Sequence, residues 1–202
     1  MLFRSHHYLG DQAAAQLHLE RGMALAVELG TFSANFFGFD QRVSALVGLA
    51  RTLWLRGFSD QALRIAQQAI DEAASRGQPV PICVSLVYAS MLLLWSGNLL
   101  NAGDFIEQLI AYARRYSLEP YRVGGIALKG ELAIARDEPE AGLDLLQGAL
   151  ESLRGQKYKV LITDFIGALA EGLRKTRQFE RRFLRSRETP QPLRAPPSRS
   201  RR

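Results

Sequence analysis

The feature that most constrains the fold of this chain is a repeat of apolar and small residues with a period of 40 positions. Apolar residues recur at Leu46, Leu86, Ile126 and Ile166, and small residues recur four positions later at Ala50, Ser90, Gly130 and Ala170. The next columns hold Leu53, Leu93, Ala133 and Leu173, then the turn residues Gly57, Gly97, Asp137 and Arg177, then Ala62, Ala102 and Gly142. Within one unit these positions are three, four or seven residues apart, which is the spacing of a helix face and not the alternation of a β-strand.

Each repeat unit is therefore predicted to be a hairpin of two antiparallel helices. The expected helices cover residues 41–56 and 59–76 in the first unit, 82–96 and 99–116 in the second, 121–136 and 139–154 in the third, and 158–175 in an incomplete fourth. Gly57 supplies a tight turn, and Ser59 is expected to cap the helix that follows, because serine side chains satisfy free backbone N–H groups at helix starts. One further helix, over residues 11–29, precedes the first unit.

A single hairpin of this kind cannot bury its apolar faces, whereas stacked neighbours complete a continuous core. Small residues at the helix crossings let two axes approach to about 8–10 Å, so that leucine and isoleucine interlock around them. We therefore expect an all-α fold, a right-handed stack of antiparallel helical hairpins with a period of about 40 residues. The expected division is a flexible N-terminus over residues 1–10, a repeat domain over 11–178 and a disordered Arg/Pro-rich tail over 179–202.

The net charge of +6 comes from the tail, because residues 179–202 contain eight arginines and two glutamates while acidic and basic residues balance elsewhere. Two interpretations remain open. An Arg-rich arm could bind nucleic acid or acidic lipid through phosphate contacts. Alternatively, an unrelated stretch replaces the second helix of the fourth unit, since the repeat predicts a small residue at 182 and an apolar one at 186, where the chain has Arg182 and Ser186. The second interpretation is favoured, and it predicts an uncovered apolar face on the helix over residues 158–175.

Composition excludes several classes of protein. A single cysteine, Cys83, excludes an internal disulfide and a cysteine-rich zinc site, and it is typical of a reducing cytosol. Cys83 shares a repeat column with Val43 and Val123, so we expect an apolar core residue and no nucleophile. The most apolar segment, residues 80–95, has 16 residues interrupted by proline, serine and tyrosine, whereas a membrane span needs roughly 20 apolar residues. With no secretory signal in view, a cytoplasmic protein without a membrane partner is expected.

An enzyme is not expected, because few residues offer acid–base or metal chemistry. His6 and His7 fit a flexible terminus better than a metal site, and His18 fits a half-buried packing residue. Glu131 and Asp164 lie on the first helices of adjacent units and could approach each other as paired carboxylates, although such acids usually lie on solvated faces. We predict no catalytic residue, no metal ligand and no cofactor.

Binding is the better hypothesis, because stacked hairpins form a superhelix whose concave face is lined by the first helix of each unit. The repeat register predicts that this face exposes eight residues, Arg51, Trp54, Met91, Trp95, Glu131, Asp164, Glu171 and Arg174. Aromatic and methionine side chains beside charged ones suit an amphipathic or extended peptide. Alternatively, Trp54 and Trp95 simply pack between units, since Leu94 and Ile134 occupy the same column as Trp54.

The small–large pattern of the first unit, with Ala50, Gly57, Ala62, Ala66 and Ala69, resembles tetratricopeptide (TPR) repeats, although the unit of 40 residues exceeds the typical 34. Residues 51–70, 88–113, 125–146 and 167–180 resemble the C-terminal helical region of large bacterial signalling ATPases, which carry a winged-helix DNA-binding domain and a nucleotide-binding domain. The chain contains no GxxxxGK[ST] phosphate-binding loop, so neither ATP hydrolysis nor specific DNA reading is carried over.

This resemblance implies a fragment of a transcriptional regulator whose repeat module senses an effector or binds a protein or peptide partner without catalysis. Nucleic acid would be a partner only if attached domains or the tail supplied the contact. The alternative hypothesis is a nucleic-acid-associated protein that acts through the Arg-rich tail.

Overall fold

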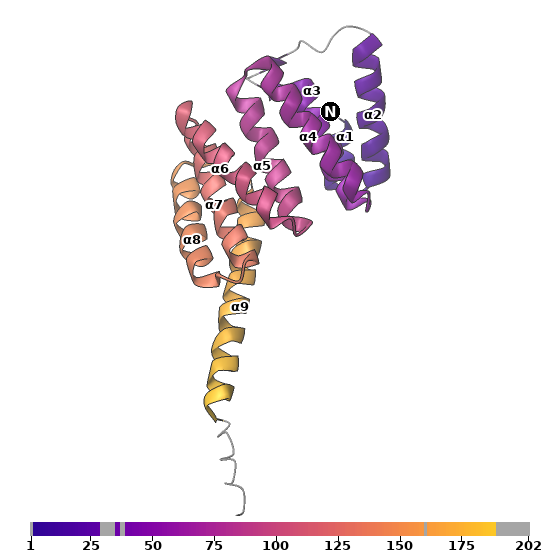
Figure 1. The fold of residues 1–202 in the computed structure, drawn as a ribbon. Helices are drawn as coiled ribbons and strands as arrows, with labels where there is room; N and C mark the ends of the chain where they lie inside the picture. Colours follow the sequence, from indigo (N-terminus) through magenta and orange to yellow (C-terminus); the bar gives the residue numbers. More distant parts are fainter. Residues whose placement is uncertain (1, 29–34, 37–38, 160, 189–202) are drawn as a thin grey trace, which may run out of the picture.

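A computed structural model describes residues 2–28, 35–36, 39–159 and 161–188, with side chains described at 5–25, 27–28, 41–159 and 161–177. The described helices are α1 (Leu2–Tyr8), α2 (Gln12–Glu28), α3 (Gln41–Leu55), α4 (Ser59–Arg76), α5 (Pro79–Trp95), α6 (Leu99–Arg115), α7 (Glu119–Ala135), α8 (Pro139–Gly155) and α9 (Ile162–Glu188). Two short strands, β1 (Asn35–Phe36) and β2 (Phe39–Asp40), pair antiparallel before α3. The prediction of an all-α stack of helical hairpins is confirmed (Figure 1).

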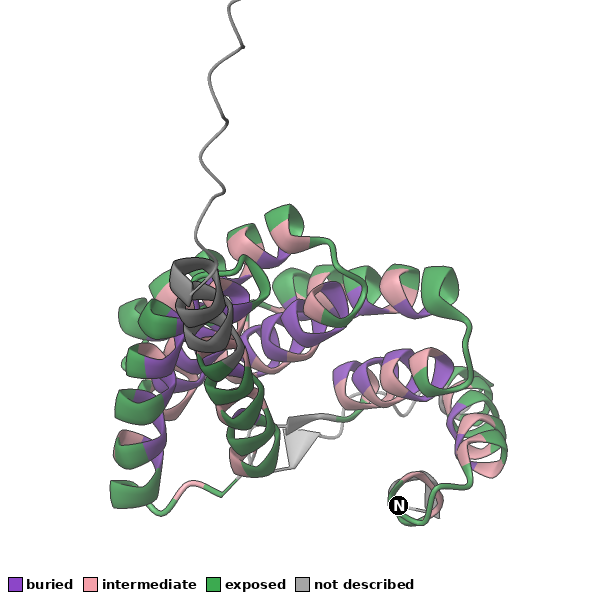
Figure 2. Ribbon diagram, turned by 90° about the horizontal axis from the view of Figure 1, so that it is seen from below, coloured by how far each residue is buried: buried purple, intermediate pink, exposed green. Residues whose placement is uncertain are grey.

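The hairpins form two layers. Helices α3, α5, α7 and α9 each contact the next member of this series and form the inner layer, whereas the main contacts of α4, α6 and α8, the outer layer, are with their neighbours along the chain. Because successive helices contact each other in the inner layer more closely than in the outer layer, the stack is curved. Figure 2 shows the resulting arch, with α1 at one end and the buried residues between the two layers.

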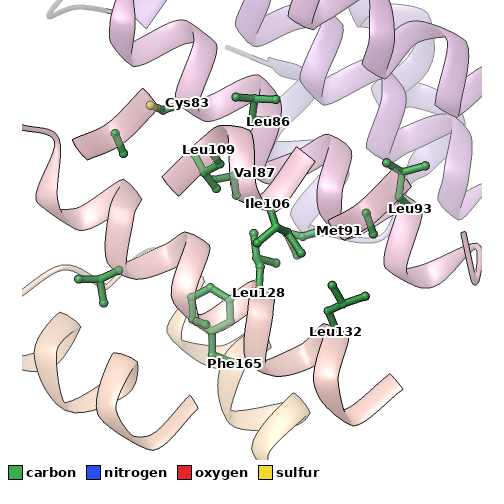
Figure 3. Packing of buried hydrophobic residues seen from close by; sticks show 14 of the residues in the cluster. Cys83, Leu86, Val87, Met91, Leu93, Ile106, Leu109, Leu128, Leu132 and Phe165 are labelled. Atoms are coloured by element: carbon green, nitrogen blue, oxygen red, sulfur yellow. The ribbon is translucent and has the colours of Figure 1, made fainter. Parts of the chain in front are cut away.

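One hydrophobic cluster runs through the stack from Val43 of α3 to Phe165 of α9. Figure 3 shows part of it, where side chains of α5, α6, α7 and α9 meet. Each fully buried leucine or isoleucine contributes about 1.5–3 kcal/mol of burial free energy. Cys83 lies in this cluster beside its column partners Val43 and Val123, and burial raises the pKa of its thiol to about 12. The thiol is therefore uncharged at neutral pH and packs as an apolar group, as predicted.

The helices from α3 to α8 end at regular intervals along the chain. A residue with left-handed backbone follows each of them, at Gly57, Gly77, Gly97, Ser117, Asp137 and Lys157, each twenty positions after the last. At five of these ends a backbone N–H bonds back to the carbonyl five residues earlier, as between Phe58 and Leu53. This is the Schellman arrangement that closes a helix C-terminus. The capping role predicted for Ser59 is wrong, because Ser59 lies inside α4 and the residue before it, Phe58, makes no side-chain cap bond.

The twenty-residue spacing of helix ends does not continue to residue 177. The repeat predicts a turn at Arg177, but α9 continues through it to Glu188. Residues 178–188 include four arginines and two glutamates, which favour helix, and no glycine occurs there to end it. The predicted start of the tail at 179 therefore falls inside α9. The remainder of the predicted tail, residues 189–202, lies outside the described residues.

The predicted uncovered face of α9 is present. Ile166 and Leu173 are 43% and 44% exposed, and Ala170 between them is also exposed. Their column partners in α5, Leu86 and Leu93, are only 3% and 7% exposed. The difference arises because α6 covers this face of α5.

The sequence pattern predicts no helix within the first ten residues. They contain the helix α1, which packs against α2. The side chain of Gln12 fixes the connection, because its Nε2 donates to the His7 carbonyl at 3.0 Å while its Oε1 lies 2.9 Å from His7 Nδ1. These contacts join residues five apart across a turn at Gly10, so helix periodicity alone did not predict them. His18, which we expected to pack half-buried, stacks on the ring of His6.

Candidate functional site

Described residues of the inner layer line two separate cavities. The first, called here the Trp95 cavity, lies toward the C-terminal ends of the inner helices and has a volume of about 310 Å³. It is lined by Leu94, Trp95, Glu131, Ile134, Ala135, Ala168, Glu171 and Lys175. The second, called here the Arg51 cavity, has a volume of about 290 Å³ and lies toward the opposite ends of the same helices. The structure thus places three of the eight predicted site residues at one cavity and Arg51 at the other.

Trp54 and Trp95 meet at the inner layer but differ in burial. The rings of Trp54 and Trp95 contact each other between α3 and α5, with centroids 6.2 Å apart. Trp54 also packs against the buried clusters of α3 and α4, whereas Trp95 remains 44% exposed at the edge of the Trp95 cavity. Trp95 is therefore an aromatic surface held in place by its neighbour.

Glu131 has an unusual electrostatic position. Burial, assisted by the negative charge of Asp164 on α9, raises the pKa of the Glu131 carboxyl to about 8. The sequence leaves an approach of these two acids open but favours solvated faces for both. The charge of Asp164 acts on Glu131, which holds its proton at neutral pH. A buried neutral carboxyl can donate a hydrogen bond, or it can ionise when a cation arrives beside it.

The remaining charges of the Trp95 cavity are paired. Arg174 Nε donates to Glu171 Oε2 at 2.7 Å, and this bond lowers the pKa of the Glu171 carboxyl. Lys175 Nζ donates to the Ile134 carbonyl at 2.8 Å and to Asp137 Oδ1 at 2.9 Å. The lysine therefore joins α9 to the end of α7 rather than offering a free positive charge.

The prediction that Met91 is exposed on the inner surface is wrong. Met91 is 1% exposed and belongs to the core cluster. It shares a column with Arg51 and Glu131, but α5 contacts α3, α4, α6 and α7, so its circumference is almost wholly covered. Arg51 and Trp54 are half-buried, while Asp164, Glu171 and Arg174 are exposed as expected.

The Arg51 cavity is assembled from α1, the inner helices and the segment that leads from α8 into α9. Its lining residues are His7, Tyr8, Ser44, Val47, Gly48, Arg51, Val84, Val87, Tyr88, Pro120, Tyr121, Gly124, Leu153, Tyr158, Leu161 and Phe165. The guanidinium of Arg51 lies over the Tyr88 ring, 4.8 Å from its centroid. The rings of Tyr121 and Tyr158 meet edge to face, with centroids 6.3 Å apart.

Burial keeps most polar groups of the Arg51 cavity neutral. It raises the pKa of Tyr121 and of Tyr158, so both phenols keep their protons at neutral pH. Burial, together with the nearby positive charge of Arg51, lowers the pKa of His7. Among these lining residues, Arg51 is thus the side chain that carries a formal charge at neutral pH.

Sequence reasoning missed the tyrosines and His7. Ser44, Gly48 and Arg51 follow one another on one face of α3, and the same columns contain Val84 and Tyr88 in α5. Extending the face of Arg51 one or two turns toward the helix start would have found Tyr88. His7, Tyr121 and Tyr158 lie in segments whose approach to this face depends on tertiary packing.

The described residues offer neither a metal-ligand cluster nor a membrane-spanning helix. No group of three or more histidine, cysteine, aspartate or glutamate side chains in the described part of the chain could hold a metal ion. Within the same residues, no helix combines the length and apolar character that crossing a lipid bilayer requires.

Comparison with known proteins supports the architecture. No protein-family model matches the chain, and no curated protein matches it in sequence. Among solved structures, the chain resembles the TPR-like repeats of a kinesin light chain candidate from Podosopora anserina, with a TM-score of 0.60, 16% identity, and coverage of 89% of this chain and 86% of that chain. A variant of that protein gives a TM-score of 0.61 at 16% identity, covering 89% of this chain and 85% of that chain. The fold is therefore a TPR-like helical-repeat solenoid.

Proposed function

We propose that this chain is a non-catalytic protein-binding module that holds a peptide segment of its partner on the inner surface of the arch. The observation that carries the proposal is Trp95, an aromatic side chain left 44% exposed beside a cavity and buttressed by Trp54. Rigid, partly exposed tryptophans are typical centres of protein interfaces, because they bury much apolar area at low cost in side-chain entropy. Asp164 and Arg174 would add charged contacts around this centre, whereas Arg51 lies at the other cavity.

The partner segment should combine an apolar anchor with a basic residue. Leu94, Ile134 and Ala168 give the Trp95 cavity an apolar wall that suits the anchor. Glu131 provides the polar determinant, because a lysine or arginine of the partner would favour its ionised form and gain an ion pair away from bulk water. Peptide side chains at helical or extended spacing could reach both features at once.

A selection of peptides displayed on phage tests this function. Peptides enriched on the protein should carry an aromatic or large aliphatic residue near a lysine or arginine. Their dissociation constants should rise about tenfold or more in Trp95→Ala, since truncating a central tryptophan removes at least about 1.4 kcal/mol. Leu100→Ala is the matched control, because Leu100 is 73% exposed on the outer-layer helix α6. Failure to enrich any such peptide, or equal weakening in both variants, contradicts the proposal.

We also propose that the module derives from a bacterial winged-helix ATPase regulator and that its cellular role is signal transduction in the cytoplasm. The resemblance of the four segments within residues 51–180 supports this origin. A translated alternative reading frame beyond codon 175 that restores the apolar stripe of the repeat would support it further. A frame without that stripe would count against it.

The alternative of a nucleic-acid-binding tail is supported by the eight arginines of residues 179–202. It predicts binding to a DNA or RNA duplex that weakens steeply with salt and disappears when these residues are deleted. Binding that survives the deletion would reject the tail as the contact.

A further inference from the structure

We propose that the Arg51 cavity is a binding site for a small aromatic carboxylate, separate from the peptide-binding surface. The two cavities share no lining residue, so this inference does not depend on the proposed peptide function. A volume of about 290 Å³ is near the lower end of the range for small-molecule sites. It suits a one- or two-ring compound rather than a peptide.

The charge of Arg51 selects an anion. Among the residues whose side chains are described, no aspartate or glutamate lines the cavity, and none forms a hydrogen bond or ion pair with Arg51. Its guanidinium carbon instead lies over the Tyr88 ring, 4.8 Å from the centroid. A contact with a ring face uses none of the guanidinium N–H groups as hydrogen-bond donors, and these groups match the two oxygens of a carboxylate.

The charge state of the other polar groups limits the ligand to one negative charge. Tyr121 and Tyr158 keep their protons, and His7 is neutral because burial and Arg51 lower its pKa. Gln12 Nε2 donates to the His7 carbonyl, so Gln12 Oε1 is the acceptor that faces His7 Nδ1. The proton of neutral His7 is therefore on Nδ1, which leaves Nε2 as an acceptor. The single positive charge of Arg51 among neutral lining groups therefore matches the single negative charge of one carboxylate.

The rest of the lining selects an apolar, flat body. Val47, Val84, Val87, Leu153 and Phe165 provide aliphatic and aromatic walls from four different parts of the chain. The pair of Tyr121 and Tyr158 adds ring faces and edges, which favour aromatic partners. Gly124 borders the same space, and a Cβ placed there would meet nothing within 4 Å.

Calorimetric titration with naphthylacetate tests the site directly, with the neutral naphthylacetamide as its matched probe. The carboxylate should bind, and the amide should bind about tenfold or more weakly, since a charge-assisted bond to arginine is lost. Arg51→Met should weaken the carboxylate by a similar factor. Arg64→Met, the same change on the exposed side of α4, should leave its affinity within about twofold.

A second variant keeps the test decisive if Arg51→Met fails to fold. Gly124→Leu places a side chain into the open space of the cavity, so it should abolish naphthylacetate binding while the protein melts at or above the temperature of the unmodified chain. Absence of naphthylacetate binding to the unmodified protein, equal binding of acid and amide, or undiminished binding in a folded Gly124→Leu variant would each overturn the proposal. Unchanged peptide binding in these variants would separate this result from that of the Trp95 surface.

Discussion

Gly130 of α7 and Gly142 of α8 face each other so closely that a Cβ at Gly130 would lie 2.8 Å from the Gly142 carbonyl oxygen. A Cβ at Gly142 would in turn lie 2.6 Å from the Gly130 carbonyl oxygen and 2.5 Å from Ile134 Cγ1. Both obstacles include backbone, which cannot rotate away as a flexible side chain could. The two columns of small residues in the sequence therefore mark the point where the helices of a hairpin cross.

Gly130→Ala should destabilise the protein by about 1–3 kcal/mol, because overpacking at the crossing outweighs the gain in helix propensity. Urea denaturation measures the change. Gly148→Ala is the matched control on α8, since Gly148 is exposed and a Cβ there meets nothing within 4 Å. The control should stabilise the protein by about 0.5–1 kcal/mol. Stabilisation of similar size at both positions would show that the crossing has room for a methyl group.

Lys157→Gly should stabilise the protein by about 1 kcal/mol. Lys157 adopts a left-handed φ of 56°, which costs a residue with a Cβ about 1–2 kcal/mol. Glycine removes this cost, although it offsets part of the gain because it makes the unfolded chain more flexible. Gly97→Ala, at a φ of 75°, should show the opposite sign. Thermal melts of both variants check the pair. Two changes of the same sign would argue against left-handed helix ends as the reason for the interval of twenty residues.

Glu131 predicts a pH dependence of stability. Its folded pKa of about 8 lies above the ordinary glutamate value of 4.5, so the folded state binds the proton more tightly than the unfolded state. The stabilisation from this proton is complete below about pH 4.5 and is lost as the pH rises toward 8. Glu131→Gln should therefore be more stable than the unmodified chain at pH 9, by on the order of 2 kcal/mol after allowance for partial exposure, with little difference at pH 4.

Urea titrations at both pH values measure this difference. Glu140→Gln, which removes an exposed carboxylate of α8, is the control and should give the same small change at pH 4 and pH 9. A Glu131→Gln variant whose advantage does not grow with pH would mean that Glu131 is already ionised at neutral pH.

Truncation along one repeat column should have very different effects at its two ends. Leu86→Ala should cost about 2–4 kcal/mol, because Leu86 is 3% exposed in the core. Ile166→Ala, in the same column, should cost less than about 1 kcal/mol, since Ile166 is 43% exposed on α9. Amide hydrogen exchange on the unmodified chain should likewise be faster in α9 than in α5. Equal losses at the two positions would indicate that another element covers α9 in solution.

Much of the architecture was predictable from sequence because it depends on local physical effects. Helix faces follow from the spacing of Leu46, Ala50 and Leu53, and helix ends follow from Gly57 and its equivalents, since backbone geometry is set within a few residues. The exposed apolar stripe of α9 was also predictable, because its column had no partner helix after it. The ends of the chain were not, because α1 depends on contacts across the Gly10 turn and α9 on the absence of a stop signal.

The candidate site shows the same division. Trp95 and Glu131 could be placed on the inner layer from the repeat register, but Met91, in the column of Glu131, proved to be 1% exposed. Repeat columns give the direction of a side chain relative to its own helix, whereas burial depends on how many helices surround that helix. Arg51, Tyr88, Tyr121 and His7 meet only because four elements distant in sequence converge.

The sequence by itself thus determined the helices, their period and the small residues at their crossings, since these depend on spacing and backbone preference. Only the tertiary structure decided which inner residues border a cavity and which charges lack a partner. Those properties are set by packing between units, and the free energies of burial and ionisation depend on the neighbours that packing supplies.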